Sequence, residues 1–184
     1  MRKSRDDLRG KWGIAIVTFV IYFLLTGFAA SLRSSLFILS LIVAGPFALG
    51  AATFSLAVAR GKETRIELIF QGFNQFTNAL AAYLLMILYI VLWALLLIVP
   101  GIVAALSYSM TFYILHDDAS IKPEDALRKS KVMMEGYKVK LFYLCLRLFL
   151  LVLLCILTFG IGFFWFVPFA HVTMANFYDD IRNQ

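Results

Sequence analysis

Charged side chains are scarce in this sequence. They make up 15% of the 184 residues, whereas hydrophobic residues make up 62%. Ordinary soluble domains carry about 25% charged and roughly 45–50% apolar residues. A soluble fold of this size has too little interior to bury so much apolar surface. The composition therefore excludes an ordinary soluble domain and predicts a protein embedded in lipid.

Cysteines are scarce too, and the common catalytic motifs are missing. Cys145 and Cys155 share one apolar run, where a helix would hold them about 15 Å apart, too far for a disulfide with each other. The chain has no zinc-ligand spacing and no HExxH, GxSxG or Walker A sequence. We therefore expect a protein that is not an enzyme and that has no metal site and no cofactor.

Acidic residues are missing from the apolar parts of the chain. All 11 aspartates and glutamates lie outside the long apolar runs. Proton-coupled pumps and intramembrane aspartyl proteases usually need a carboxylate inside the bilayer, so both classes are disfavoured. The net charge of +6 comes from basic residues that lie between the apolar runs, and this placement suggests a membrane surface and no nucleic-acid partner.

What the chain does have is six apolar runs. A helix needs about 20 residues to cross the hydrocarbon core, so the fourth run is short. We predict six transmembrane helices in an all-α, polytopic membrane protein. The runs are 13–32, 36–59, 78–99, 101–115, 141–158 and 161–178.

Prolines and glycines mark where these helices break. The stretch 78–115 is too long to cross once and should break at Pro100–Gly101. The stretch 141–178 should break between Gly160 and Gly162. Pro46 falls inside the second run, where we expect a kink.

The basic residues predict the orientation. Fifteen of the 17 lysines and arginines lie in the N-terminal segment, between the second and third runs, between the fourth and fifth runs, or after the sixth. Arg33 is the one on the opposite side, and Arg147 lies inside the fifth run. The positive-inside rule then places both termini in the cytoplasm of a bacterial cell, with a multi-pass chain in the cytoplasmic membrane. Basic residues before the first run also resemble a signal peptide, but the run is longer than a usual signal core, so we expect a retained first helix.

Two polar stretches, 63–76 and 123–135, have apolar residues at helical spacing. We predict that both are amphipathic helices in the headgroup layer, or that they form a plain cytoplasmic cap on the bundle.

Sparse matches at shifts of 58, 64 and 122 residues suggest a threefold internal repeat. A single transmembrane domain, 1–184, would then consist of three hairpins at about 8–59, 63–115 and 123–178.

Two ionisable residues, Arg147 and His171, lie inside predicted spans, at similar depth. They are candidates for an anion or lipid-binding site. Alternatively, Arg147 snorkels to the headgroups, and a neutral His171 forms a hydrogen bond between helices. Ser107, Ser109 and Thr111 form a polar group in the fourth span, where such residues usually hold helices together.

Short motifs along most of the chain resemble the bacterial domain-of-unknown-function family 975. Two departures are Arg147-Leu148-Phe149, where the family has small residues, and Asp118, where asparagine is usual. The resemblance implies a multi-span bacterial membrane protein, and it brings no activity or catalytic residues. The motifs are 45–50, 59–63, 71–76, 99–102, 108–110, 114–118, 126–131, 134–136 and 160–162.

The function that these observations favour is a non-enzymatic membrane protein with a scaffold, envelope-stress or immunity-like role. It would act through contacts with membrane lipids, anionic ones included, with a membrane-protein partner, or with further copies of itself. The alternative is a small-solute binding or transport component, because some transporter subunits also have six spans at this length.

Overall fold

The computed structural model describes residues 1–31, 37–158 and 160–183, and it describes side chains outside 26–40. The predicted outer turn around Arg33 lies outside the described residues. Every described element is a helix. In chain order these are α1 (Arg2–Asp7), α2 (Trp12–Ser31), α3 (Phe37–Ala59), the 3-10 helix η2 (Ile66–Gln75), α4 (Phe76–Leu96), α5 (Ile98–Tyr108), α6 (Thr111–Asp117), α7 (Pro123–Met133), α8 (Lys138–Leu157) and α9 (Phe163–Arg182).

Four helical segments of the described chain are long and apolar enough to cross a membrane. A shorter apolar helix covers Trp12–Leu25, and α9 is not among the four. The all-helical class and the membrane character predicted from composition are thus confirmed. The four segments are Leu41–Ala59, Ile66–Leu96, Ile98–Asp117 and Lys138–Leu157.

Helix α3 lies at the centre of the arrangement. It packs against α2, η2, α4, α6 and α9, and its apolar window is 72% buried. Two hydrophobic clusters meet on it. One contains Leu49 and Leu56 together with residues of α4 to α9, and the other contains Phe54 and Val58 together with residues of α2 and α9. The central position follows from the small side chains of α3, which let neighbouring backbones approach closely.

The closest approach is made by η2, which packs along α3. A Cβ added to Gly72 would lie 1.9 Å from the Pro46 carbonyl oxygen, and one added to Gly50 would lie 1.8 Å from the Ile69 carbonyl oxygen. The stretch predicted as a surface amphipathic helix is therefore a 3-10 helix that contacts the middle of α3. The predicted apolar stripe is only partly buried, since Ile69 is enclosed and Phe70 remains 45% exposed.

Of the two predicted breaks between helices, one lies at a different residue from the one expected and the other lies where it was expected. The chain between α4 and α5 breaks at Leu97, which is extended, and Pro100 and Gly101 lie inside the first turn of α5. The prediction of a break at Pro100–Gly101 was thus wrong by three residues, because a proline costs little in a first turn that needs no N–H partner. Gly160, with a φ of 86°, lies in the turn before α9 as predicted.

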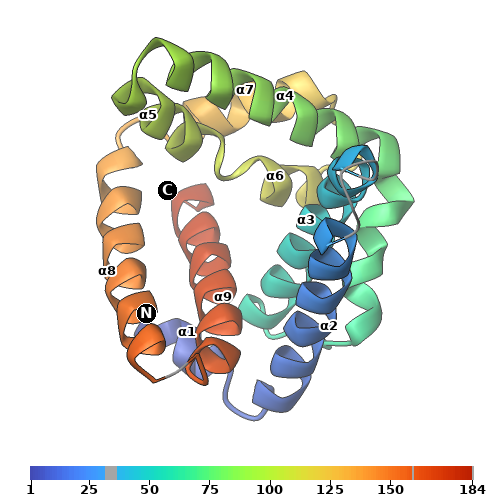
Figure 1. Ribbon diagram of the computed structural model, residues 1–184, viewed down its shortest axis with the longest axis vertical. Coiled ribbons are helices and arrows are strands. Elements are labelled where there is room, and N and C mark those ends of the chain that lie inside the picture. The colour runs from blue at the N-terminus through green and yellow to red at the C-terminus, as the bar shows by residue number, and fades with distance from the viewer. Residues whose placement is uncertain (32–36, 159, 184) are drawn as a thin grey trace.

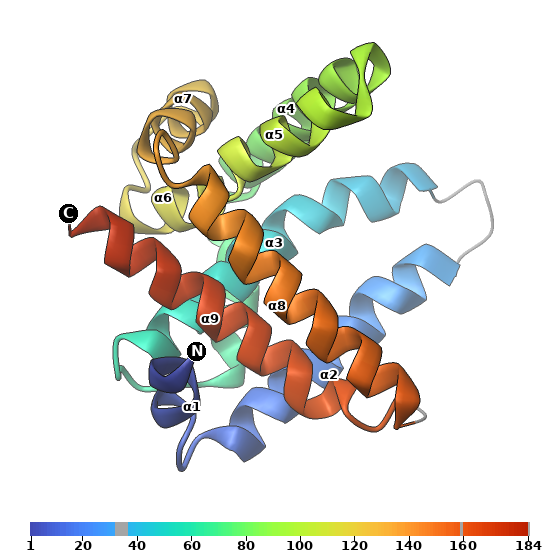
Figure 2. The same cartoon turned by 90° about the vertical axis from the view of Figure 1, so that its left-hand side faces the viewer.

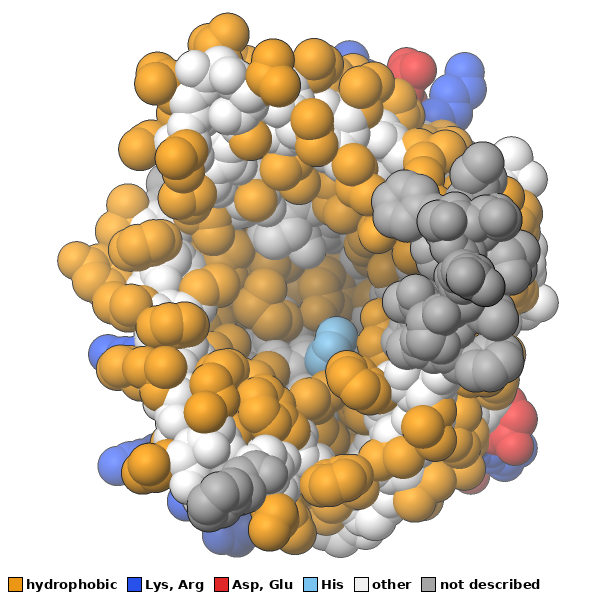
Figure 3. Space-filling model, viewed as in Figure 1, with side chains coloured by type: hydrophobic (Ala, Val, Ile, Leu, Met, Phe, Trp, Pro, Cys, Tyr) orange, Lys and Arg blue, Asp and Glu red, His pale blue; other side chains and the backbone are white. Residues whose placement is uncertain are grey.

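The far ends of the helix pairs diverge. In Figure 2, α1, α6, α7 and the C-terminal end of α9 gather on one side, here called the charged end. The pairs α2–α3, α4–α5 and α8–α9 spread apart toward the opposite side, here called the open end (Figures 1 and 2). Figure 3 shows a hollow in the middle of the open end, lined mainly by hydrophobic side chains, with charged groups at the margin of the view.

Candidate functional site

The last turns of α3, α6 and α9 are joined at the charged end by one arginine. Arg60, which follows α3, donates from Nη1 and Nη2 to the two carboxylate oxygens of Asp117 at 2.7 and 3.0 Å. Its Nη2 also donates to Asp179 Oδ1 at 2.7 Å, and its Nε lies 3.2 Å from both oxygens of that carboxylate. A planar guanidinium is suited to such paired contacts.

Asp117 is the most heavily hydrogen-bonded carboxylate of this cluster. It also accepts from the Tyr178 hydroxyl at 2.8 Å and from Arg182. The side chains of Arg60, Asp117 and Asp179 are 21%, 13% and 15% exposed. The hydrogen bonds to Asp117 first, and to Asp179 second, raise the pKa of Arg60 above its ordinary value. The cluster therefore stays charged and ties three helix ends together.

Sequence reasoning missed this cluster. From the sequence alone, Arg60 is one of several cations that predict the topology, and Asp117 belongs to a motif without an assigned role. The two family-like motifs 59–63 and 114–118 each supply one member. The available signal was the position of all three ionic residues at the end of an apolar run, where opposite charges on adjacent helices pair readily.

Arg147 lines a cleft of about 360 Å³ between α1, α8 and α9. Lys3 and Lys140 also line it, together with one carboxylate, that of Asp180. In the described part of the chain, none of these four charged side chains forms a salt bridge. The candidate site predicted from Arg147 thus coincides with a cleft that has an excess of positive charge.

His171, the other member of the predicted pair, lies in a different environment. Its ring stacks on Phe19 of α2 with centroids 4.5 Å apart, and it meets Tyr22 edge-on at 6.4 Å. It is not among the residues that line the cleft of Arg147. The structure does not bring the two residues into one site, because the cleft of Arg147 lies between α1, α8 and α9, whereas the His171 ring packs against α2.

The polar group of the fourth span bonds mainly to its own helices. Ser107, Ser109 and Thr111 donate to the carbonyl oxygens of Val103, Leu106 and Tyr108. The contact between helices comes instead from Ser130 of α7. Its hydroxyl donates to the Ser107 carbonyl at 2.8 Å and accepts from the Met110 N–H at 3.2 Å. Ser130 thus satisfies backbone groups where α5 gives way to α6.

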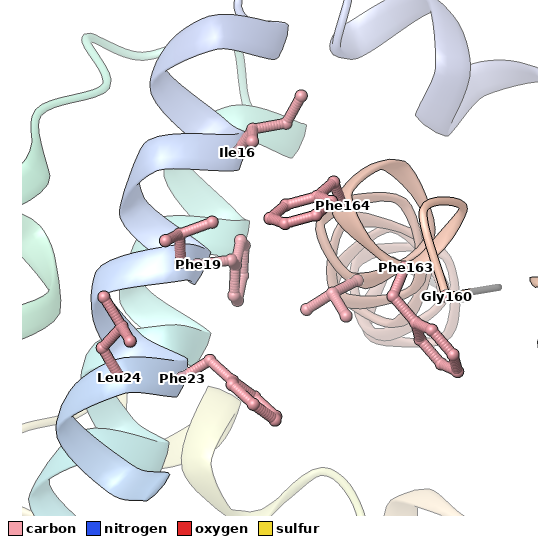
Figure 4. A pocket seen from close by; sticks show the side chains of 9 residues that line it. Ile16, Phe19, Phe23, Leu24, Gly160, Phe163 and Phe164 are labelled. Carbon is pink, nitrogen blue, oxygen red and sulfur yellow. The ribbon is translucent and has the colours of Figure 1, made fainter. Parts of the chain in front are cut away.

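An apolar cavity of about 470 Å³ lies between α2 and the start of α9 (Figure 4). It contains no charged side chain. Such a lining can hold hydrocarbon and offers no group for acid–base or nucleophilic chemistry. Residues that line it include Ile16, Phe19 and Phe23 of α2 and Phe163, Phe164 and Val167 of α9.

Among the described residues, the structure shows no group of side chains suited to bind a metal ion. No cluster of three or more His, Cys, Asp and Glu side chains there is placed to hold an ion. Cys145 and Cys155 are both free thiols.

Comparison with known proteins bears on the C-terminal part of the chain. No curated protein and no solved structure matches it. The family model described as protein of unknown function (DUF975) matches residues 95–184. This range includes α6, α8 and α9, and hence Asp117, Arg147 and Asp179. The family resemblance inferred from the motifs is therefore confirmed over residues 95–184, which match the model of a family whose function is unknown.

Proposed function

We propose that this chain is a non-enzymatic protein of the bacterial cytoplasmic membrane that acts through contacts with lipid or protein partners. It would cross the membrane six times as three hairpins, with both termini in the cytoplasm. In this proposal α2 and α9 complete the set begun by the four long apolar segments. The scaffold, envelope-stress and immunity-like roles are all compatible with such contacts.

The observation that carries this proposal is the apolar surface of the open end. Leu95, Ile98 and Leu157 are 86%, 77% and 78% exposed, and the apolar windows of α4 and α8 are 11% and 17% buried. Exposing apolar surface to water costs about 25 cal/mol per Å², and soluble proteins rarely leave large continuous patches uncovered. Lipid or a membrane partner is the natural cover.

The separation of charge supports the orientation. Arg60, Lys140 and the basic α7 lie with the termini at the charged end, whereas the turns between α4 and α5 and before α9 are apolar. A membrane whose cytoplasmic surface is anionic favours this arrangement. The proposed orientation therefore places the Arg60 cluster at the cytoplasmic surface.

The orientation can be tested by labelling single cysteines in intact cells after Cys145 and Cys155 are replaced by alanine. A cysteine at Ile98, in the exposed turn before α5, should react with an impermeant thiol reagent. Cysteines at Lys62 and Lys131 should react only after the cells are broken. Labelling of Lys131→Cys in intact cells would contradict six spans with cytoplasmic termini.

The threefold repeat is part of the same proposal. Thr53 of α3, Thr111 at the start of α6 and Thr173 of α9 are buried, and each donates to a carbonyl of the preceding turn. The second segment of each predicted hairpin thus carries one threonine in a similar setting. An experimental structure in lipid would test the repeat through pairwise superposition of the three helix pairs.

The hollow in the open end (Figure 3) favours a second candidate, a small-solute binding or transport component. Its mainly hydrophobic lining suits an apolar solute. The two candidates make different predictions for protein purified in mild detergent. A partner-binding protein should retain a defined protein or lipid, whereas a solute carrier should gain thermal stability from a solute in the hollow and retain no partner.

A further inference from the structure

Arg147 is placed differently from the other arginines, because it lies well inside the apolar helix α8. Five arginines pair with carboxylates elsewhere, whereas Arg147, like Arg2 and Arg5 near the N-terminus, forms no such pair among the described residues. The paired arginines are Arg9, Arg60, Arg65, Arg128 and Arg182. An arginine inside an apolar helix is costly when it is idle, most of all at the centre of the membrane and less near the interface. A site for an anion would explain why this cation is tolerated.

Hydrogen bonds that do not involve the cations hold the walls of the cleft in place. Asn176 of α9 donates from its amide nitrogen to Asp7 Oδ2 at 2.7 Å and to Ser4 Oγ at 3.3 Å. Ser4 is fully buried, and Asn176 is 5% exposed. These bonds tie α1 to α9, so that Lys3 faces the same cleft as the cations of α8. The cleft is therefore built between helices that are already fixed to one another.

The cations lie at two depths along α8. Lys140 is in the first turn of α8, and Arg147 follows seven residues later, which corresponds to about 10 Å along the axis. The Lys140 ammonium lies 5.8 Å from the Tyr137 ring centroid and 6.0 Å from that of Phe177. A headgroup phosphate could meet Lys3 and Lys140 at the surface while Arg147 reaches toward it from below.

Apolar side chains also border the cleft. Leu144 and Phe177 line it together with Arg147, and beyond Arg147 the exposed apolar face of α8 continues toward the open end through Leu150 and Leu154. A free phosphate ion would use the cations alone. A phospholipid would use the cations for its phosphate and the apolar face for its chains.

We propose that this cleft binds the phosphate of an anionic phospholipid, with Arg147 as the deepest of its three cationic contacts. This inference rests on the proposed function, because it requires the charged end to lie at a membrane surface. It adds a ligand class, a location and the residues that make the contacts. Excess positive charge between helices at this level is a known basis for headgroup binding in general.

The test measures the melting temperature of the purified full-length protein in neutral detergent, with phosphatidylglycerol, phosphatidylcholine or inorganic phosphate added. Binding at saturating lipid should raise the melting temperature by roughly 5 °C. Phosphatidylglycerol should give the largest rise, phosphatidylcholine a small one and inorganic phosphate none. Equal stabilisation by inorganic phosphate would overturn the assignment to a lipid.

Variants assign the effect to the cleft. Arg147→Leu should remove most of the difference between phosphatidylglycerol and phosphatidylcholine, and Arg147→Lys should keep part of it, because lysine retains the charge but not the planar fork. Lys140→Gln, on an exposed residue, should weaken the response even if Arg147→Leu fails to fold. Arg65→Leu is the matched control, since Arg65 is exposed at the charged end outside the cleft and should respond like the wild type.

The outcomes separate the two proposals. If phosphatidylglycerol stabilises the wild type, Arg147→Leu and Lys140→Gln equally, the cleft is not the site, while a role through lipid contacts elsewhere stands. If no lipid stabilises the wild type and the purified protein retains neither lipid nor partner, both this inference and the proposed function are wrong.

Discussion

The charged end and the open end of the molecule are held together by different forces. At the charged end, Arg60, Asp117 and Asp179 bind three helices through hydrogen-bonded ion pairs, and Ser130 joins α7 to the break between α5 and α6. At the open end, the pairs α2–α3, α4–α5 and α8–α9 diverge (Figure 2), and leucines such as Leu95 remain exposed. Lipid is as apolar as leucine and gives no drive for such side chains to associate with one another. The arrangement of the helices therefore depends strongly on the polar bonds of the charged end and on close backbone contacts such as those of Gly50 and Gly72 between α3 and η2.

The largest effect should come from breaking the ion cluster. Arg60→Met leaves Asp117 and Asp179 close together without their shared counter-charge, and breaking a buried ion pair costs about 3–5 kcal/mol. We expect a large fall in the melting temperature of the purified protein. Adding Asp179→Asn to Arg60→Met should restore part of it, because the repulsion is relieved. The exposed pair of Arg65 with Glu63 supplies the control Arg65→Met, and an equal fall there would refute the special role of the cluster.

The contact of η2 with α3 should be the next most sensitive feature. The Cβ of Gly72→Ala would collide with the Pro46 carbonyl oxygen, and its nearest neighbours are backbone atoms that cannot turn away. Overpacking of this kind typically costs about 1–3 kcal/mol. Gly13→Ala in α2, where no atom lies within 4 Å of the added Cβ, should instead gain up to about 1 kcal/mol of helix propensity. Thermal melting of both variants checks the contrast, and a neutral Gly72→Ala would show that η2 does not pack this closely.

Loss of the Ser130 hydroxyl should have an intermediate effect. Ser130→Ala leaves the Met110 N–H and the Ser107 carbonyl without their present partner, which costs about 1–3 kcal/mol when the groups are buried. Ser120→Ala removes a hydroxyl that bonds to Asp118 in an exposed turn and should shift the melting temperature much less. Hydrogen exchange at Met110 is the more specific measurement, and unchanged protection in Ser130→Ala would contradict this role.

The smallest effect is expected at the open end. Leu95→Ala removes a side chain that is 86% exposed, so the free energy of unfolding should hardly change. Leu56→Ala on α3, where the side chain is fully buried, should cost about 2–5 kcal/mol. Comparable losses at the two positions would mean that the open end is packed against something, such as a second copy, under the conditions of the measurement.

Local features of the fold were predictable because they depend on short stretches of sequence. The turn at Gly160 and the proline-started helix α7 follow from residues that act within a few positions. The extended break at Leu97 was misplaced because a proline can end one helix or begin the next, and the local sequence permits both. The close packing of η2 involves Gly50 and Pro46 of α3, which lie outside η2 in the sequence, so the local pattern does not predict it.

The candidate site also has one part that the sequence predicts and another part that depends on the packing of the helices. Arg147 stood out because a charge inside an apolar run is unusual, and the structure adds Lys3 and Lys140 to it. The pairing of Arg147 with His171 assumed that equal depth on two helices means contact, whereas His171 faces Phe19 of α2. Rotation about the helix axis decides which neighbour a side chain meets, and apolar sequences with little amphipathic character leave that rotation open.

The sequence by itself determined that this chain forms apolar helices suited to lipid, with its acidic residues and most of its basic residues outside the apolar runs. Those properties are set by composition and by the length of each run, which no tertiary contact can change. Only the tertiary structure decided that Arg60 joins residues 57 and 119 positions away and that three cations share one cleft. The physical reason is that bringing such distant residues together requires one particular packing of the helices, selected by close contacts and a few polar bonds spread over the whole chain.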